Sequence, residues 1–450
     1  MADLLTLPTD YERTRGDLPE LPLINMFPED SIGEGKVILQ SRSGLVASQE
    51  YSVYPVRGMY TEAGAFNGDT FSVLGTVLYR GTNVLGTIDG DGPVSMDSYS
   101  DYLFVCAGAS IWLYDGTTLT TVDFPDGASV RKVLVAQSRL IAIEDSTQRI
   151  YWSEPLETTI PDLNFAEAEN SPDRLLDMLY IGDSLILFGE ATVEFWMVGA
   201  DADIPFVPLT GRVYSRGIIS TAACTKAAAT FAWITEAGQV CLTEPTNIIS
   251  STELELRIST SSVVKTWLFN MDQTEHMAVT IDTETWCVNP LNPSRWFKFE
   301  SYGYPNWEPH CYSDGVFGSS HRGRFLEWAT TFIDPDDQPL ERRFRAWLPS
   351  NTVSSVVSNI VIRTNSGETP YLDGVNANPL VEMRSSRDGG KLWSNWRSIS
   401  LGAQGYYRKI VTWLSCGIFS YPGAMFEFRV TDPVPFRVSS VSANEPYGGF

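Results

Sequence analysis

The sequence predicts an all-β protein: a six- or seven-bladed β-propeller with an N-terminal extended arm and a C-terminal β-sandwich-like domain. Three observations lead to this prediction. Aromatic residues make up 12% of the chain beside 35 Gly and 26 Pro, which favours strands and turns over helices. A strand that carries aromatic residues recurs at a nearly constant interval. The last hundred residues break this rhythm and differ in charge.

The repeat consists of a short apolar strand, a tight turn and a strand that carries aromatic residues. The starts of seven such strands are separated by 35, 39, 43, 47, 45 and 39 residues. A period near 40–45 residues is typical of propeller blades, whose sheets bury both faces only in a ring. A β-sandwich with coincidental spacing is the alternative. The seven strands are TVLYR (76–80), IWLYD (111–115), IYWSE (150–154), VEFWM (193–197), VCLTE (240–244), TWCVN (285–289) and RFLEW (324–328).

Composition divides the chain into three parts. Four prolines lie among acids and leucines near the start, and proline biases the backbone to extended conformations, so residues 1–50 are expected to form an extended arm and the first strands. Residues 51–335 contain the repeat and form the propeller. Residues 336–450 form a separate β domain, and the boundary falls within IDPDDQPLERRFRAWLPSN (333–351), which is rich in proline and charge. Helix content is expected to be low, and only 221–233 could form a short helix.

The net charge of −23 is unevenly distributed. Residues 351–450 carry nine Lys and Arg against seven Asp and Glu, so residues 1–350 hold a charge of −25. A surface that binds duplex DNA should be basic, because its affinity comes from neutralising phosphates. The chain as a whole has the opposite character, although acidity alone also fits simple solubility.

Targeting and metal-binding patterns are missing from the sequence. The first residues lack an apolar signal-peptide core, and no run of 18 apolar residues predicts a membrane span. The six cysteines form no Cys-x-x-Cys pair and are expected to be core thiols in a reducing cytoplasm. His310, Cys311 and His321 match no zinc spacing. Acidic turns at 143–146 and 201–205 are read as solvated turns, with calcium as the alternative. We therefore predict no cofactor and no metal site.

One motif is recognisable in the last domain. Within SSRDGGKLWSNW, the residues Ser386, Asp388, Gly390 and Trp393 fit the Asp-box, a β-hairpin turn known from sialidase propellers. Its carboxylate accepts backbone hydrogen bonds within the hairpin, its glycines take positive φ, and its tryptophan packs against it. Leu392 replaces the usual Thr, and we find one copy, outside the propeller repeat. The motif is therefore interpreted as a structural turn.

No catalytic residue is predicted. His276, His310 and His321 are the only histidines, and none lies near a Gly-x-Ser-x-Gly elbow, so each is expected to have a structural role. A sialidase would need three arginines and a Tyr–Glu pair, which no spacing in the sequence points to. The main rivals to a structural protein are a sialidase-like glycan hydrolase and a glycan- or protein-binding propeller, because a fold alone does not define a function.

Several long stretches of the sequence, in order along 80–438, resemble the tail hub, or packaged-DNA stabilisation (nozzle), proteins of short-tailed bacteriophages. Leu392 and the Leu414-Ser415-Cys416 segment depart from the polar or basic residues expected there. The stretches are RGTNVLGTIDGDGPVSMDSYSDYLFVC (80–106), NFAEAENSPDRLLDMLYIGDSLILFGEATVEFWMVG (164–199), PFVPLTGRVYSRGIISTAA (205–223), DGGKLWSNWRSISLGAQGYYRKIVTWLSCGIF (388–419) and FEFRVTDPVPFRV (426–438).

The resemblance implies a structural protein of the virion tail, assembled in the host cytoplasm, and not an enzyme. It implies a homo-oligomer, a hexameric ring below the portal, with the tail adaptor protein, tail fibres or spikes and distal tail proteins as partners. Packaged DNA would pass through the ring without specific binding. An acidic wall agrees with this role, because a basic patch would gain affinity by releasing counterions from the phosphates.

Overall fold

The computed structural model shows two compact units. We call Ala47–Asp282 with Glu308–Glu327 the propeller unit, and Met1–Val46 with Thr283–Trp307 and Trp328–Phe450 the sandwich unit. The described residues are 3–5, 12–13, 20–30, 37–168, 172–200, 204–227, 229–304, 306–350 and 354–446.

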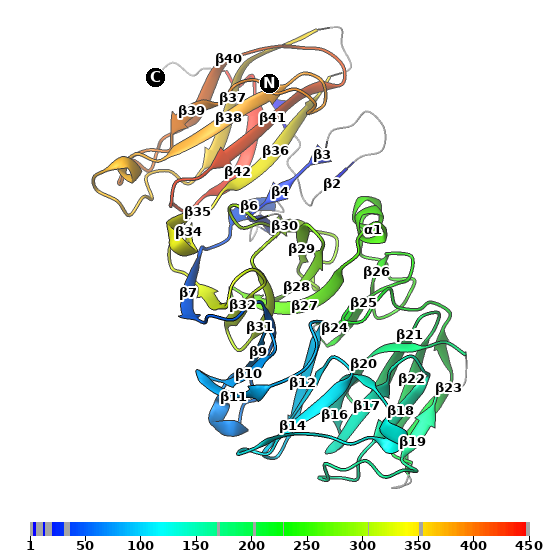
Figure 1. The fold of residues 1–450 in the computed structure, drawn as a ribbon. Coiled ribbons are helices and arrows are strands. Elements are labelled where there is room, and N and C mark those ends of the chain that lie inside the picture. The colour runs from blue at the N-terminus through cyan, green and yellow to red at the C-terminus, as the bar shows by residue number, and fades with distance from the viewer. Residues whose placement is uncertain are drawn as a thin grey trace. The chain divides into compact units, whose positions relative to one another are not determined.

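The propeller unit is built from seven antiparallel sheets, coloured from blue through green to yellow in Figure 1. In the first six, strands pair in chain order, so the chain meanders outward through each sheet. The strands are β8 (Val56–Tyr60), β9 (Phe71–Leu74), β10 (Val77–Arg80) and β11 (Asn83–Thr87); β12 (Val94–Tyr99), β13 (Tyr102–Ala107), β14 (Ser110–Tyr114) and β15 (Leu119–Thr121); β16 (Val130–Ala136), β17 (Arg139–Glu144), β18 (Arg149–Trp152) and β19 (Phe165–Glu167); β20 (Leu175–Ile181), β21 (Ser184–Gly189), β22 (Val193–Val198) and β23 (Phe206–Tyr214); β24 (Cys224–Ala227), β25 (Thr230–Ile234) and β26 (Val240–Leu242); β27 (Val264–Met271) and β28 (Thr274–Ile281); and β31 (Pro309–Ser313), β32 (Val316–Ser319) and β33 (Arg324–Trp328).

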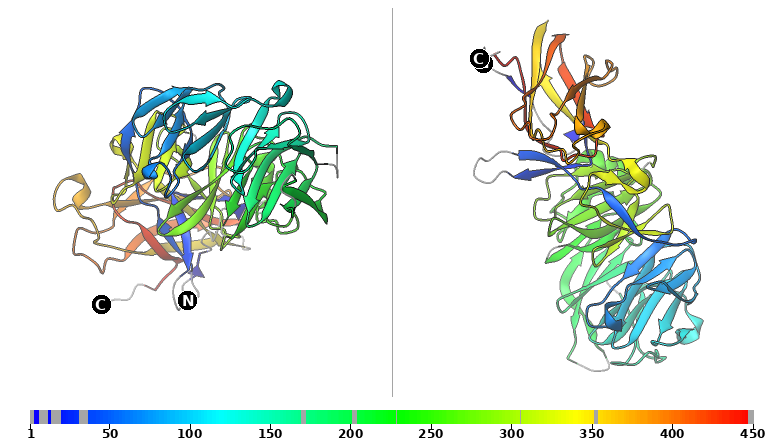
Figure 2. Two further views of the ribbon diagram at one scale, coloured as in Figure 1. Left: turned by 90° about the horizontal axis from the view of Figure 1, so that it is seen from below. Right: turned by 90° about the vertical axis from the view of Figure 1, so that its left-hand side faces the viewer.

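These sheets are the blades of a propeller, because their first strands form a closed circle. β8 contacts β12, and contacts continue through β16, β20, β24, β27 and β31 back to β8. The seventh blade is completed by β7 (Leu45–Glu50), which pairs with β33 although the two are far apart in sequence. Figure 2 shows the blades from two further directions. The propeller prediction is confirmed, and the blade number is seven.

Alternating side chains of each strand pack against the two neighbouring blades, as period-two strands with both faces buried require. In β13, Leu103 and Val105 pack with Phe71 of the first blade. Phe104 and Cys106 of the same strand pack with Leu140 of the third blade. A single blade therefore has no core of its own, and the ring supplies one on each side.

The aromatic strands that carried the sequence prediction occupy equivalent places. Six of them form or overlap β10, β14, β18, β22, β26 and β33, which are the third strands of their sheets. The suggested helix at 221–233 is wrong, because its residues form β24 and β25 with Trp233 fully buried. Among the described residues the single α-helix is α1 (Thr252–Ser259), which begins after Ser251, whose Oγ accepts a hydrogen bond from the Leu254 backbone N–H.

Gly323 lies where two backbone segments of the propeller unit pack closely together. A Cβ at this position would lie 2.0 Å from the carbonyl oxygen of Val53 and 2.7 Å from that of Tyr51, and the Tyr51 N–H donates to the Gly323 carbonyl at 2.5 Å. Gly323→Ala is therefore expected to destabilise the propeller unit by about 1–3 kcal/mol, because backbone must move to admit one methyl group. Urea unfolding followed by tryptophan fluorescence measures the change. Gly92→Ala is the matched control, because Gly92, like Gly323, lacks a positive φ but meets no atom within 4 Å, and it should change the stability little.

The sandwich unit contains two larger sheets and two short strand pairs. The first sheet has the order β40-β37-β42-β6-β5, with β1 also paired to β42, and the second contains β29-β30-β4-β36-β41-β38-β39. The strands within residues 20–30 and 37–41 of the predicted N-terminal arm thus pair with other strands of this unit. The strands are β1 (Asp3–Leu4), β2 (Glu12–Arg13), β3 (Glu20–Leu21), β4 (Leu23–Ile24), β5 (Met26–Asp30), β6 (Val37–Ser41), β29 (Glu284–Val288), β30 (Phe297–Phe299), β34 (Ile333–Asp334), β35 (Gln338–Pro339), β36 (Arg342–Pro349), β37 (Ser355–Thr364), β38 (Leu380–Ser386), β39 (Arg397–Ser400), β40 (Val411–Phe419), β41 (Gly423–Val430) and β42 (Arg437–Ala443).

Candidate functional site

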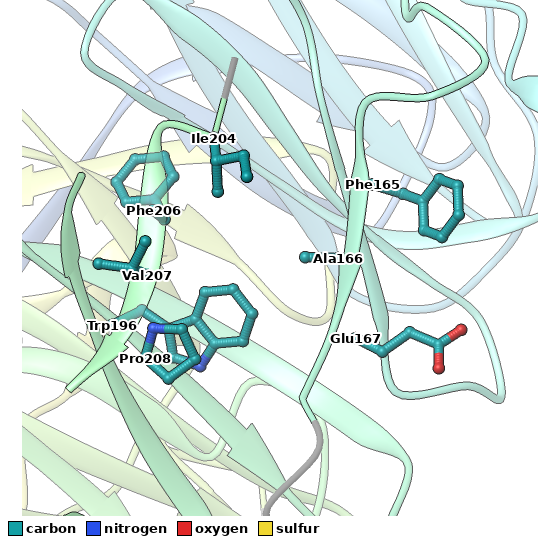
Figure 3. Close-up of a pocket in the computed structure, with 8 residues that line it drawn as sticks. All are labelled: Phe165, Ala166, Glu167, Trp196, Ile204, Phe206, Val207 and Pro208. Carbon is teal, nitrogen blue, oxygen red and sulfur yellow. The ribbon is translucent and has the colours of Figure 1, made fainter. Parts of the chain in front are cut away.

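A pocket of about 790 Å³ lies between outer strands of the third and fourth blades (Figure 3). β19 forms one wall, and β22 and β23 form the other. Figure 3 shows the small side chain of Ala166 pointing toward Trp196 and Phe206, whereas Phe165 and Glu167 point to the far side of their strand. The pocket therefore exists because an alanine faces two buried aromatic rings across the gap between blades.

The described residues that line this pocket are mostly apolar. Glu167 is the one ionisable side chain among the described residues that line it. The Arg149 guanidinium donates to Glu167 with an Nη2–Oε1 distance of 2.9 Å and thereby lowers the pKa of that carboxyl. The same guanidinium lies 4.6 Å from the centre of the Phe165 ring. The pocket can bury an apolar group, and the residues described around it include no nucleophile with an adjacent base.

A second cavity, of about 310 Å³, lies among the first strands of the blades, at the axis of the ring. Residues of β8, β12, β16, β20 and β24 line it, among them Met59, Met96, Asp97, Lys132, Met178 and Lys226. Strands of five blades thus meet at one cavity, and that cavity mixes methionine side chains with charged groups.

The charges at the axis are partly paired. The Lys132 ammonium lies 2.7 Å from the buried Asp177 carboxylate. Burial opposes the charge of Lys132, but the attraction and hydrogen bond of Asp177, together with Cys224 and Cys106, outweigh it and raise the pKa of the lysine. Asp97 accepts hydrogen bonds from the backbone N–H groups of Val135 at 2.7 Å and Ser98 at 2.9 Å. Burial nevertheless raises the pKa of Asp97, which backbone hydrogen bonds and the nearby Lys226 partly offset.

The Asp-box residues Ser386, Asp388, Gly390 and Trp393 lie together in the hairpin between β38 and β39. Asp388 Oδ1 accepts from the Ser386 hydroxyl at 2.7 Å and from the backbone N–H groups of Lys391 at 3.0 Å and Leu392 at 2.9 Å. Gly390 has a φ of 90°, and the Trp393 indole N–H donates to its carbonyl at 2.9 Å. The four residues bind one another and the local backbone, which is the arrangement of a turn.

The tryptophans of this hairpin stack between arginines of the adjacent sheet. The guanidinium carbons of Arg345 and Arg384 each lie 4.8 Å from the Trp393 ring centre. Trp396 lies between Arg384, at 4.5 Å, and Arg429, at 4.2 Å. Arg345 and Arg384 also share the fully buried carboxylate of Glu427. The hairpin is thus fastened to β36, β38 and β41 by alternating cations and aromatic rings.

Asp388→Ala is expected to loosen this hairpin and lower the unfolding midpoint of the sandwich unit, whereas Asp388→Asn, which keeps an acceptor oxygen, should lower it less. Hydrogen bonds from Leu392, Ser386 and Lys391 lower the pKa of Asp388. Its stabilising contribution is therefore present above about pH 4, the unfolded value, and is lost as pH falls through the folded pKa. Thermal unfolding at pH 7 and at pH 3 measures this: the difference between Asp388→Ala and the parent chain should shrink at pH 3, and a constant difference would contradict the assignment.

The three histidines all belong to the propeller unit. His276 lies on β28 with its Nδ1 3.0 Å from the Thr274 carbonyl oxygen and its ring stacked on Phe269. His310 lies on β31, and burial, followed by the charge of Lys265, holds its pKa well below the ordinary value. Burial lowers the pKa of His321 as well. Among the described residues, no three His, Cys, Asp or Glu side chains are grouped to hold a metal ion.

The cysteines and the first acidic turn are accounted for by burial and by an ion pair. All six cysteines are buried and free. Asp145, in the first acidic turn, binds Arg131, which lowers the pKa of the carboxyl against the effect of burial. Residues 201–203 of the second turn lie outside the described residues.

Sequence reasoning missed both cavities. The pocket between blades depends on Ala166 and Trp196 becoming neighbours across two sheets, for which the sequence contains no signal. The axis had a usable signal: Lys132 precedes the apolar run Val133–Ala136, and Lys226 lies among small residues, and a lysine is unusual in such buried segments.

The sequence matches two families, described as bacteriophage P22 Gp10, β-propeller, over residues 6–289, and bacteriophage P22 Gp10, β-sandwich, over residues 342–445. A relative, the tail hub protein gp10 of Salmonella phage P22, is 26% identical over 239 residues, covering 48% of this chain and 50% of the relative. The chain thus aligns with about half the length of that relative.

Two solved structures that match this chain share little of its sequence. The β-propeller domain of Myceliophteria thermophila Cps50 (Swd1) is 12% identical, with a TM-score of 0.42 over 63% of this chain and 99% of that chain. The computationally designed Ika8 protein is 10% identical, with a TM-score of 0.41 over 69% of this chain and 100% of that chain.

Within the described residues, α1 is much too short to cross a bilayer.

The two family matches follow the architecture of the structure, a propeller followed by a sandwich, and the first of them alone covers more than half of the chain. The chain belongs to the family of the bacteriophage P22 Gp10 propeller-and-sandwich proteins.

Proposed function

We propose that this chain is a structural subunit of a short phage tail, and that it forms a hexameric ring below the portal and its adaptor. The ring would continue the DNA channel, help to retain the packaged genome and conduct it during ejection. Membership of the Gp10 family and similarity to a tail hub protein support the tail role. The family is not an enzyme family, and the described residues of the larger pocket contain no catalytic pair.

The observation that carries the channel proposal is the charge of the propeller unit. It contains 14 Lys and Arg against 34 Asp and Glu, a net charge of −20, so that the sandwich unit holds only −3. A negatively charged channel wall repels phosphates. It cannot neutralise them, so DNA gains no binding affinity from counterion release. Six copies would strengthen this field, although salt screens it beyond about 8 Å.

Partners are part of the same proposal. We place the chain in the virion tail, assembled in the host cytoplasm, in contact with the tail adaptor protein, tail fibres or spikes and distal tail proteins. The pocket between the third and fourth blades is an apolar surface suited to such protein contacts. No cofactor is required, and DNA passes without specific binding.

Electron microscopy of the purified chain, alone and mixed with its adaptor, tests the assembly. We expect rings with six-fold symmetry, and a chain that stays monomeric even with the adaptor would contradict the proposal. A filter-binding assay with duplex DNA tests the channel. We expect no retention at physiological salt, whereas salt-sensitive retention would contradict the non-binding wall.

The rival function, a glycan-binding or sialidase-like propeller, predicts different results. Turnover in a panel of fluorogenic glycosides would overturn the structural assignment. Binding on a glycan array, together with absence of the chain from purified virions, would favour a lectin role.

A further inference from the structure

One segment of the sandwich unit differs in charge from the rest of the chain. Residues 387–418 hold five Lys and Arg against one Asp, a net charge of +4, so the other residues of the chain hold −27. The one acid, Asp388, accepts hydrogen bonds within its own turn. The five cations, none of which forms an ion pair with a described residue, are Arg387, Lys391, Arg397, Arg408 and Lys409.

Two of these cations lie along β40. β39 and β40 are the end strands of their sheets, and they lie at the same edge of the unit (Figure 1). The Arg397 guanidinium donates to the Leu414 carbonyl at 2.6 Å, and the Trp413 indole N–H donates to the Arg397 carbonyl at 2.9 Å. The guanidinium carbon of Arg387 lies 5.7 Å from the Phe419 ring centre. These contacts hold two exposed arginines beside β40 and leave their charges uncompensated.

Exposed apolar side chains adjoin the two arginines. Leu414 and Ile418 are 48% and 56% exposed on β40, and Ile418 lies opposite Val356 of β37, which is 62% exposed. We call Val356, Arg387, Arg397, Leu414 and Ile418 the β40 surface. Exposed apolar groups gathered with arginine are typical of a surface that contacts another protein.

The backbone of β40 is unsuited to pairing with an added strand, which needs an extended edge with free backbone groups. Ser415 and Gly417 have φ values of 55° and 114°, and the pairing of β40 with β37 shifts register between Leu414 and Gly417. Arg397 already occupies the Leu414 carbonyl. A partner therefore has to contact the side chains of the β40 surface, and negative charge on that partner would compensate the arginines.

The propeller unit, with a net charge of −20, carries a complementary surface. In four blades the turn between the first and second strands holds an exposed aspartate that forms no ion pair with a described residue. Because the first strands circle the axis and the blades share one strand order, these turns lie at one end of the propeller. We call the four residues the acidic turns: Asp101, Asp183, Asp272 and Asp314.

From these observations we propose that the β40 surface of one copy of this chain docks on the acidic turns of the next copy. Two propeller units, or two β40 surfaces, would bring like charges together, so charge disfavours the contact of either surface with itself. A contact between two different surfaces can be repeated by rotation until it closes into a ring. The inference rests on the proposed ring and names the surfaces that would build it.

Charge reversal on the β40 surface tests this contact. Mass photometry of the full chain over a dilution series measures the concentration needed for rings, under the conditions in which the parent chain forms them. Arg387→Glu with Arg397→Glu should raise that concentration by about 100-fold or more, because attractive contacts become repulsive. Arg363→Glu with Arg437→Glu makes the same change in net charge at two other half-exposed arginines and should leave it nearly unchanged.

The outcomes separate this inference from the proposed ring. Rings that survive the reversal at the parent's concentration would overturn the β40 contact and leave the ring proposal standing. Equal losses in the two double variants would show that net charge, and not the β40 surface, governs assembly, which also overturns the contact. A parent chain that forms no rings, even with the adaptor, would overturn both proposals.

Carbodiimide cross-linking of the unmodified chain needs no variant. The reagent joins a lysine amine to a carboxylate in contact with it, and Lys391 lies on the same hairpin as Arg387. In rings assembled from equal amounts of isotope-labelled and unlabelled chain, we expect mixed-isotope peptides that join Lys391 to one of the acidic turns. Rings whose mixed-isotope cross-links from Lys391 reach only other carboxylates would contradict the docking.

Discussion

Glu308→Gln is expected to destabilise the propeller unit by about 3–5 kcal/mol, because it removes one partner of a buried ion pair and leaves the other charge uncompensated. Glu308 and Arg324 are only 2% and 3% exposed. The carboxylate accepts from Arg324 Nε and Nη2, both at 2.7 Å, and from the Ser319 hydroxyl at 2.7 Å. Glutamine keeps the volume but turns an amide donor toward a guanidinium that also donates.

The large expected loss of stability also follows from where this ion pair lies. Glu308 immediately precedes β31, and Arg324 begins β33, the strand to which the closing strand β7 pairs. Loss of the pair therefore weakens the blade that closes the ring. Since domains are stable by about 5–15 kcal/mol in total, the expected loss is a large part of the whole.

Urea unfolding followed by tryptophan fluorescence measures the loss. Glu236→Gln is the matched control, because Glu236 and Arg216 form a long, exposed pair at 3.8 Å, and it should change little. A Glu308→Gln variant as stable as this control would show that the buried pair does not hold the seventh blade.

The second large effect is expected at Glu427, in the sandwich unit. This carboxylate is fully buried and serves two arginines at once: Arg345 Nε donates to its Oε1 at 2.7 Å, and Arg384 donates to its Oε2. Glu427→Leu should destabilise the sandwich unit by about 3–5 kcal/mol, because two half-buried guanidinium groups lose their common counter-charge. They would then repel each other on either side of Trp393.

Rescue distinguishes charge from packing in this prediction. The triple variant Glu427→Leu, Arg345→Met, Arg384→Met removes the whole charge cluster and should recover much of the loss. Arg363→Gln, in an exposed pair with Glu445, is the control and should have little effect. If the triple variant were less stable than Glu427→Leu alone, stacking of the arginines on the tryptophans, and not charge balance, would dominate at this site. Thermal unfolding of the full chain provides the comparison.

The sequence pattern correctly predicted the features that depend only on residues close together in the chain, namely the aromatic strands and the Asp-box turn. The aromatic strands at 76–80 and 111–115 became third strands of blades, because alternation along a strand and a tight turn before it are written in a few consecutive residues. The Asp-box residues lie together for the same reason, since Asp388 accepts hydrogen bonds within four positions of itself. The segment 221–233 suggested a short helix because alanine has the highest helix propensity, and burial against neighbouring blades decided for strands.

Long-range placement escaped sequence reasoning. Residues 45–50 lie in the predicted arm, yet they complete the seventh blade beside a strand that begins at residue 324. Nothing in either segment alone identifies the other as its partner. The tail-hub resemblance supplied the family, which the matches over both domains confirm.

By itself, the sequence determined that this protein is all-β, that blades repeat around a ring, and that the propeller is acidic, because composition and period-two alternation are properties of the chain that survive any arrangement of the sheets. Only the tertiary structure decided that there are seven blades, which strand closes the ring, and that lysines of separate blades meet at one axis. Those features depend on contacts between residues far apart in sequence, and such contacts leave no periodic trace in the chain.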